Sequence, residues 1–122
     1  MKPSEPTRGL PLKEILPMRI IESSLDFAAV KEGGRAVVCF HSPHSAYSRR
    51  TLQRLHELEP QFPSFKFGVV DVDRPATTPL LSEFQIYGIP ATCVFRPAAE
   101  VFRYVGELRE QAACKLLARH CV

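Results

Sequence analysis

The fold of this chain is decided by the stretch RAVVCFHSPHSAYSRR, residues 35–50. Residues 36–40 form a continuous apolar run, which is typical of a strand whose sheet is covered by helices on both faces. Small polar residues follow, and leucines then recur at helical spacing as Leu52, Leu55 and Leu58. The stretch therefore predicts a strand that leads directly into the N-terminus of a helix. Such a junction has unpaired backbone N–H groups, and α/β proteins commonly place their chemistry there.

A second informative stretch is YGIPATCVF, residues 87–95. A proline behind a glycine at the head of an apolar strand indicates a cis peptide bond, here between Ile89 and Pro90. Together the two stretches resemble the thioredoxin family, in which the active-site strand and helix are followed by a cis-proline strand. The resemblance covers residues 18–122 and rests on the order and spacing of these elements.

Local patterns predict the other elements. Strands are expected over residues 18–22, 65–71 and 101–105, and helices over 25–30, from Ser45 to near Glu59, from Thr78, and after Gly106. Ser23 or Ser24 can cap the first helix, and Thr78 followed by Pro79 reads as a cap with proline at the first helical position. In the last helix, Ala113, Leu116 and Leu117 share one face.

The resulting order is β-α-β-α-β-α-β-β-α, which is the order of the thioredoxin family. We therefore expect a thioredoxin-like α/β fold, a three-layer sandwich with a mixed central sheet flanked by helices. The strands that begin at Pro90 and Val101 are expected to run antiparallel to a parallel core.

Length and composition predict one domain with a short lead-in. The 122 residues, 45% of them hydrophobic, are enough to bury a core without disulfides or metals. Residues 1–17 carry four prolines among polar and charged residues and are expected to be extended or disordered, with residues 18–122 as the thioredoxin-like domain. Leu10, Leu12, Ile15 and Leu16 would suffice to dock the lead-in on the domain.

Charge and hydropathy argue against some partners. The net charge of +3 comes from 16 basic and 13 acidic residues spread along the chain, which is typical of an ordinary solvated surface. No apolar run approaches the roughly 20 residues that span a bilayer, and the N-terminus lacks the apolar core of a signal peptide. We expect an intracellular, cytoplasmic protein that binds neither nucleic acid nor membranes, with organelle import left open.

The departure from the family lies in the chemistry. The resemblance places the family's Cys-x-x-Cys motif on Ser45-Ala46-Tyr47-Ser48, so that both thiols are replaced by hydroxyls. Thiol–disulfide exchange requires a thiolate that attacks a disulfide, and serine supplies none. The family's buried acid falls on Cys39 and its partner lysine on Val69. The resemblance therefore implies a redox-inactive member with degenerate active-site positions at Ser45 and Ser48.

Two other kinds of site have some support in the sequence. Cys39, His41 and His44 have residue types that bind zinc, but a fourth ligand is missing and Cys39 is expected inside the sheet. Ser45 and Ser48 near His44 could suggest a hydrolase, yet no orienting acid or activated-nucleophile motif accompanies them, and Ser45 is better explained as a helix cap. We expect no metal, no cofactor and no catalytic residue.

The element that survives loss of the thiols is the family's peptide groove. In the family, the cis-proline and the residue before it line a groove that takes an extended peptide through backbone hydrogen bonds. The resemblance carries this role onto one set of positions in this chain: His44, Ala46, Tyr47, Ile89, Pro90 and Gly106. It implies a protein partner, with Tyr47 as an aromatic anchor.

We therefore expect a non-catalytic protein-binding domain that serves as a subunit or adaptor in a larger assembly, or as a chaperone-type cofactor. The segment FPSFKF, residues 62–67, is also similar to phosducin-type thioredoxin domains, which lack a working Cys-x-x-Cys and bind proteins. The alternative is an atypical thiol-disulfide oxidoreductase or thiol sensor that uses one non-motif cysteine. The four candidates are Cys39, Cys93, Cys114 and Cys121. The partner's identity and the oligomeric state stay open.

Overall fold

The computed structural model describes residues 18–32, 34–96 and 99–119. Within these ranges it forms a five-stranded sheet in the order β1-β3-β2-β4-β5. The strands are β1 (Arg19–Ile20), β2 (Ala36–His41), β3 (Lys66–Asp71), β4 (Ala91–Phe95) and β5 (Glu100–Val105). The lead-in expected over residues 1–17, and Cys121, lie outside the described residues.

The sheet is mixed, with one correction to the expected strand directions. Strands β1 and β2 both run parallel to β3, and β4 runs antiparallel to β2. Strand β5 pairs antiparallel with β4. The expectation that both final strands oppose the core is therefore right for β4 and wrong for β5. A hairpin reverses the chain, so β5 returns in the direction of β2.

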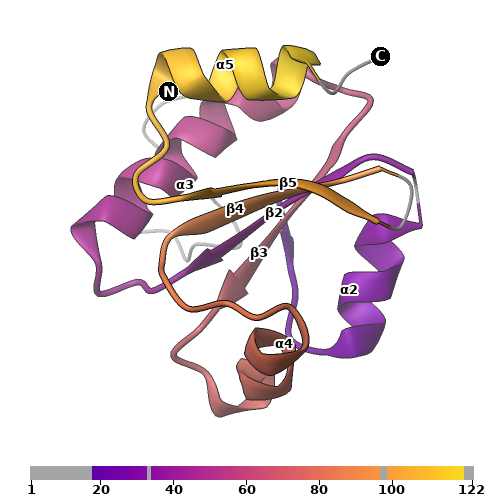
Figure 1. The fold of residues 1–122 in the computed structure, drawn as a ribbon, viewed down its shortest axis with the longest axis vertical. Helices are drawn as coiled ribbons and strands as arrows, with labels where there is room; N and C mark the ends of the chain where they lie inside the picture. The colour runs from indigo at the N-terminus through magenta and orange to yellow at the C-terminus, as the bar shows by residue number, and fades with distance from the viewer. Residues whose placement is uncertain (1–17, 33, 97–98, 120–122) are drawn as a thin grey trace, which may run out of the picture.

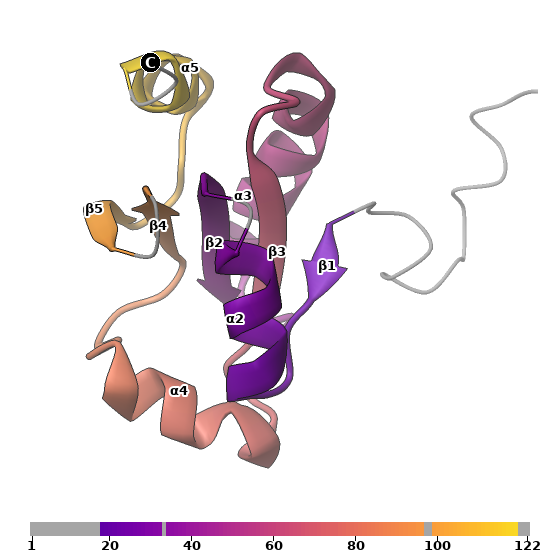
Figure 2. The same cartoon turned by 90° about the vertical axis from the view of Figure 1, so that its right-hand side faces the viewer.

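Helices cover both faces of the sheet, as the sequence predicts. They are α2 (Ser24–Lys31), α3 (Ala46–Leu58), α4 (Thr78–Glu83) and α5 (Glu110–Arg119). Helices α3 and α5 lie on one side of the sheet, and α2 and α4 on the other (Figures 1 and 2). The predicted order of elements is confirmed. None of the helices in the described ranges is long and apolar enough to cross a bilayer.

The continuous apolar run of β2 divides between two cores. Val37 and Cys39 pack with the α3 and α5 side chains, whereas Val38 and Phe40 pack with those of α2 and α4. This alternation follows from the period of two along a strand. Because both faces are covered, every residue of β2 is buried, and the strand needs no polar face.

The predicted cap of α2 is confirmed, and the predicted cap of α4 is wrong. Ser23 caps α2, its hydroxyl accepting a hydrogen bond from the Asp26 N–H at 3.2 Å. Thr78, however, is the first helical residue and not the cap, which is Thr77. The Thr77 hydroxyl makes no capping bond; it donates toward the carbonyl oxygens of Asp71, at 2.7 Å, and Arg74, at 2.9 Å.

Candidate functional site

The junction between β2 and α3 is built around Ser45. This residue has extended backbone angles, φ −96° and ψ 123°, and its hydroxyl accepts a hydrogen bond from the Ser48 N–H at 3.2 Å. It therefore satisfies one of the four N–H groups that begin a helix without a partner. The prediction that Ser45 caps the helix is confirmed.

Ser48 has a different structural task. Its side chain is fully buried, and its oxygen accepts a hydrogen bond from the Ser42 N–H at 3.1 Å. This bond fixes the loop between β2 and α3 against the first turn of the helix. Both hydroxyls at the positions where the sequence resemblance places the motif thiols thus act as hydrogen-bond acceptors for the local backbone.

The loop after β2 is also tied to the end of β3. The Ser42 hydroxyl donates to the Asp73 carboxylate at 2.5 Å and accepts from the His44 N–H at 3.3 Å. The Asp73 N–H in turn donates to the Asp71 carboxylate at 2.9 Å, which closes the turn after β3. Asp71 and Asp73 therefore form a turn.

The two histidines near the junction are in opposite environments. His41 is only 2% exposed, and burial lowers the pKa of its imidazole although Asp71 and Asp73 act in the opposite direction. Its Nδ1 atom is buried without a hydrogen-bond partner. His44 is exposed, as expected for a loop residue. Among the described residues, the hydroxyl oxygens of Ser45 and Ser48 bond to backbone N–H groups and not to an imidazole.

The cysteines of the sheet are buried thiols. Cys39, at the position of the family's buried acid, pairs in register with Val69 inside the α3 and α5 core. Cys93 lies in the core on the opposite face. Burial raises the pKa of each of these two thiols to about 12. A raised pKa disfavours the thiolate form that exchange chemistry needs.

The cis-proline predicted from the sequence is confirmed. The Ile89–Pro90 peptide bond is cis, Pro90 is buried and Ile89 is half-buried. The Pro90 carbonyl accepts a hydrogen bond from the Gly106 N–H at 2.8 Å. Gly106 has φ +111°, a left-handed conformation that favours glycine. This places Gly106 directly beside Pro90.

Residues after Gly106 connect this side to helix α3. The Arg50 guanidinium forms two hydrogen bonds with the Glu107 carboxylate, at 3.0 and 3.2 Å. Arg50 also lies over the Tyr47 ring, 5.1 Å from its centroid. One residue on, the buried Thr51 hydroxyl accepts from the Leu108 N–H at 3.0 Å. These contacts join the first two turns of α3, which include Ala46 and Tyr47, to the Gly106 side.

Two residues that the sequence interpretation missed lie on the same end of the molecule. Tyr87 is 90% exposed and Val105 57% exposed. Gly88, the residue after Tyr87, lies against Val105, because a Cβ atom at Gly88 would come 3.0 Å from the Val105 side chain. Arg103 fixes the start of the segment that leads to Tyr87 and Pro90. It donates hydrogen bonds to the carbonyl oxygens of Phe84, at 2.6 Å, and Gln85, at 2.8 Å. An aromatic residue before the Gly-Ile-Pro sequence was the available signal.

We refer to these residues together as the loop-end surface. It consists of the six positions expected from the sequence and the two added by the structure: His44, Ala46, Tyr47, Tyr87, Ile89, Pro90, Val105 and Gly106. Tyr47 is 60% exposed, so with Tyr87 and Val105 it contributes large exposed apolar side chains to the surface. Apolar groups gathered in this way are typical of contact sites.

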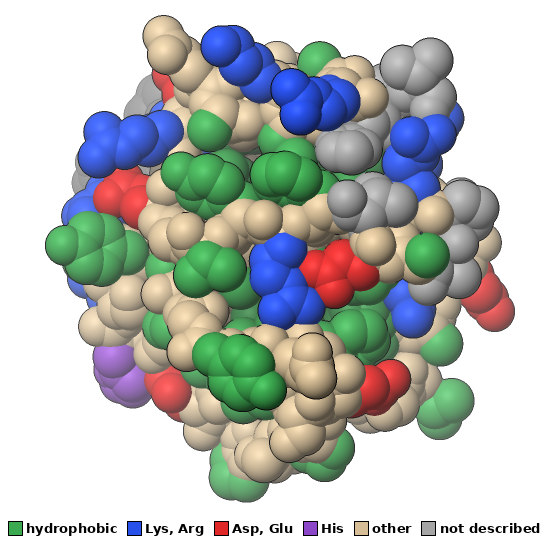
Figure 3. All heavy atoms as spheres, viewed as in Figure 1, with side chains coloured by type: hydrophobic (Ala, Val, Ile, Leu, Met, Phe, Trp, Pro, Cys, Tyr) green, Lys and Arg blue, Asp and Glu red, His purple; other side chains and the backbone are tan. Residues whose placement is uncertain are grey.

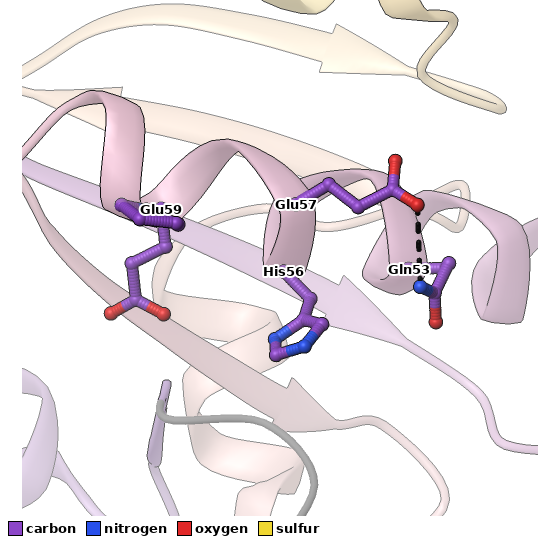
Figure 4. A pocket seen from close by; sticks show the side chains of 5 residues that line it. Gln53, His56, Glu57 and Glu59 are labelled. Atoms are coloured by element: carbon purple, nitrogen blue, oxygen red, sulfur yellow. Dashed lines mark hydrogen bonds between the residues drawn. The ribbon is translucent and has the colours of Figure 1, made fainter. Parts of the chain in front are cut away.

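A depression near the C-terminal end of α3 is a separate feature. It has a volume of about 610 Å³ and is lined by Gln53, His56, Glu57, Glu59 and Pro60. Burial raises the pKa of the Glu59 carboxyl, and His56 acts in the opposite direction. Glu57 points away from these two residues and accepts a hydrogen bond from Gln53 at 3.3 Å (Figure 4). The residues that line this depression lie toward the C-terminal end of α3, whereas Ser45 and Ser48 lie at its N-terminal end.

The zinc hypothesis gains no support from the geometry. Across residues 18–32, 34–96 and 99–119, no group of three or more histidine, cysteine and acidic side chains could hold a metal ion. Cys39 is buried in the sheet core and His44 is exposed to solvent, so the three residues of the sequence pattern do not converge.

Comparison with known proteins identifies the fold. No family model and no curated protein sequence matches this chain. Solved structures do match. Thioredoxin from Fasciola hepatica superposes with a TM-score of 0.76 at 22% identity, covering 84% of this chain and 99% of that one. The chain has the thioredoxin fold.

Other thioredoxins give the same result. A single-site mutant of thioredoxin from Halobacterium salinarum matches with a TM-score of 0.79 at 17% identity, covering 85% of this chain and 90% of that one. Plasmodium falciparum thioredoxin matches with a TM-score of 0.76 at 18% identity, covering 84% and 99%. At these identities the likeness establishes the thioredoxin fold, and function has to be argued from the residues of the site.

Proposed function

We propose that this chain is a redox-inactive thioredoxin-fold protein that binds a protein partner on its loop-end surface. It would act as a subunit or adaptor in a larger assembly, or as a chaperone-type cofactor. The partner contributes an extended segment that lies beside Ile89 and packs against Tyr47. The observation that carries this proposal is the exposure of Tyr47, Tyr87 and Val105 around a junction whose hydroxyls already serve the fold.

Loss of exchange chemistry is supported by the state of the thiols and hydroxyls. Ser45 and Ser48 stand at the positions where the family resemblance places both thiols, and each hydroxyl oxygen accepts a backbone hydrogen bond. Cys39 and Cys93 are fully buried, with the pKa of each thiol raised to about 12. A thiol in that state is almost entirely protonated at neutral pH and is a poor nucleophile.

Binding is supported by the way the surface is held. Tyr47 lies beneath the Arg50 guanidinium, and Arg50 is fixed by its paired hydrogen bonds to Glu107. An exposed aromatic ring in a fixed position is the type of side chain that dominates binding energies at interfaces. Main-chain groups near Ile89 would supply affinity to an extended segment, and the apolar side chains would supply selectivity.

The test of binding is affinity capture followed by titration of each captured protein. Tyr47→Ala and Ile89→Asp should each weaken binding of the true partner at least tenfold, the effect expected of an interface anchor. Leu25, 83% exposed on α2 and distant in sequence, provides matched controls in Leu25→Ala and Leu25→Asp, which should bind like the parent. Circular dichroism verifies folding. Unchanged affinity in both loop-end variants would place the interface elsewhere.

The test of redox inactivity is independent of the partner. With dithiothreitol as reductant, the protein should reduce insulin no faster than the buffer does, because exchange requires a thiolate. The double variant Ser45→Cys/Ser48→Cys should form a disulfide on oxidation, since a helix N-terminus favours a thiolate, but should turn over poorly with Cys39 in place of the buried acid. Turnover by the parent that disappears in Cys39→Ser would instead establish the alternative, an atypical thiol enzyme.

A further inference from the structure

Among the described residues, β5 is an edge strand with no further strand paired to it. It is the last strand of the sheet and spans six residues, whereas β1 at the opposite edge has only two. Figure 2 shows β5 at the outer end of the sheet, with none of the drawn elements beyond it. The pairing of β4 with β5 shifts register between Val94 and Phe95, whose partners are Phe102 and Glu100, so the regular ladder of β5 covers residues 102–105. A regular edge of this length can accept another strand.

The hydrogen-bond pattern shows which backbone groups face that edge. Opposite residues of antiparallel strands alternate between hydrogen-bonded pairs and non-bonded pairs. Gly106 donates to Pro90, so in the same register Tyr104 is bonded to Thr92 and Phe102 to Val94. The backbone N–H and C=O groups of the intervening residues, Arg103 and Val105, therefore point outward.

A groove runs beside this edge between β5 and α5. It has a volume of about 180 Å³ and is lined by Phe102, Tyr104, Ala112, Lys115, Leu116 and Arg119. A strand added to β5 would present every second side chain on the α5 face of the sheet, next to the groove. The groove is apolar along its floor, and it suits aliphatic side chains there.

The charge at the rim is positive. Lys115 and Arg119 are exposed one helical turn apart on α5, and neither forms an ion pair within the described part of the chain. Figure 3 shows Lys and Arg side chains along the α5 side of this face, above hydrophobic side chains. A second copy of the chain paired through β5 would bring two sets of these cations together. The rim therefore disfavours self-association and favours acidic groups.

We propose that the β5 edge is a second binding surface, which shares only Val105 with the loop-end surface, and that it accepts an extended acidic segment of another protein. The segment adds a strand to the sheet through the outward groups of Arg103 and Val105. Its aliphatic side chains enter the groove beside Phe102 and Tyr104, and its carboxylates pair with Lys115 and Arg119. This proposal stands independently of the proposed function of the loop-end surface.

The experiment titrates the full chain with the capped peptide Glu-Val-Thr-Val-Thr-Val-Glu and follows backbone amide signals by NMR. We expect shifts centred on Arg103 and Val105, and at least threefold weaker binding when lysine replaces both glutamates. N-methylation of one alternate set of peptide residues should abolish binding, and methylation of the other set should not, because only one set faces β5.

Charge variants complete the test. The double variant Lys115→Gln/Arg119→Gln should bind the peptide about threefold to tenfold more weakly, the scale of two exposed charge pairs. Arg19→Gln, which removes an exposed cation from the opposite edge strand, should bind like the parent. The proposal is overturned if β5 signals do not shift, if the lysine peptide binds as well, or if sedimentation shows that a second copy occupies the edge.

Discussion

Replacing Ser48 by alanine tests whether the hydroxyls of the junction are structural. The change removes the acceptor for the Ser42 N–H, which lies 3.1 Å from the Ser48 oxygen. Because Ser48 is fully buried, water cannot take over this bond without rearrangement. Leaving a buried donor unsatisfied costs about 1–3 kcal/mol, so the free energy of unfolding should fall by that amount. For a domain of this size the melting temperature should fall by about 3–12 °C.

Two further substitutions separate the possible causes. Ser45→Ala removes a half-buried helix cap and should cost about 1 kcal/mol. Ser48→Cys keeps the buried volume but offers a weak acceptor, so it should also lose stability. Ser82, exposed on α4, gives the control Ser82→Ala, for which we expect a change within about 0.5 kcal/mol.

Urea unfolding followed by circular dichroism measures all four variants. The reasoning fails if Ser48→Ala unfolds within about 0.5 kcal/mol of the parent, since that is the scale of a surface substitution. It also fails if Ser48→Cys matches the parent while Ser48→Ala does not. That result would assign the effect to lost packing volume and not to the hydrogen bond.

Three other predictions concern the thiols, pH and the lead-in. A maleimide should label Cys114 in native protein well before Cys39 and Cys93, because the latter two are fully buried; peptide mapping that finds early label on either would contradict this. Burial keeps the pKa of His41 below 6.5 in the folded chain, so the unfolded chain binds more protons and stability should fall as the pH drops below about 6.5. Melting temperatures at pH 7.5 and 5.5 should show a smaller decline in His41→Gln, and equal declines would exclude His41 as a cause. A chain that starts at Pro17 should keep most of its stability to urea; a loss above about 2 kcal/mol, the scale of one buried aliphatic side chain, would mean that the lead-in packs on the domain.

Much of the fold follows from local patterns in the sequence. The apolar run of β2 and the leucine spacing of α3 show which side chains must be buried. That pattern is the same whichever elements they pack against. The ends of elements depend on partners elsewhere. The strand expected over residues 18–22 contains only Arg19–Ile20, because its ladder is limited to Gly68 and Val69 of β3. Thr78 was predicted as the cap because local sequence does not show the hydrogen bonds that the Thr77 hydroxyl donates to two backbone carbonyl oxygens.

The candidate site was predictable to a similar degree. Ser45 as a cap is a local property, and the structure confirms it. The pairing of Arg50 with Glu107 spans 57 positions in the sequence, so no local pattern reports it. The contact of Val105 with the segment after Tyr87 depends likewise on the pairing of β4 with β5. Whether the loop-end surface binds a partner stays a prediction.

The Arg103 side chain has a consequence for the thermodynamics of any partner that contacts Tyr87. Its bonds to the Phe84 and Gln85 carbonyls hold one end of the segment, and the pairing of β4 holds the other from Ala91 onward. The short stretch between these anchors has little conformational freedom left to lose. A partner would therefore meet an ordered surface, and little of the interaction free energy would be spent on immobilising it. In Arg103→Ala the segment would be less ordered before binding. Each binding event would then lose more conformational entropy, although the contact residues are unchanged.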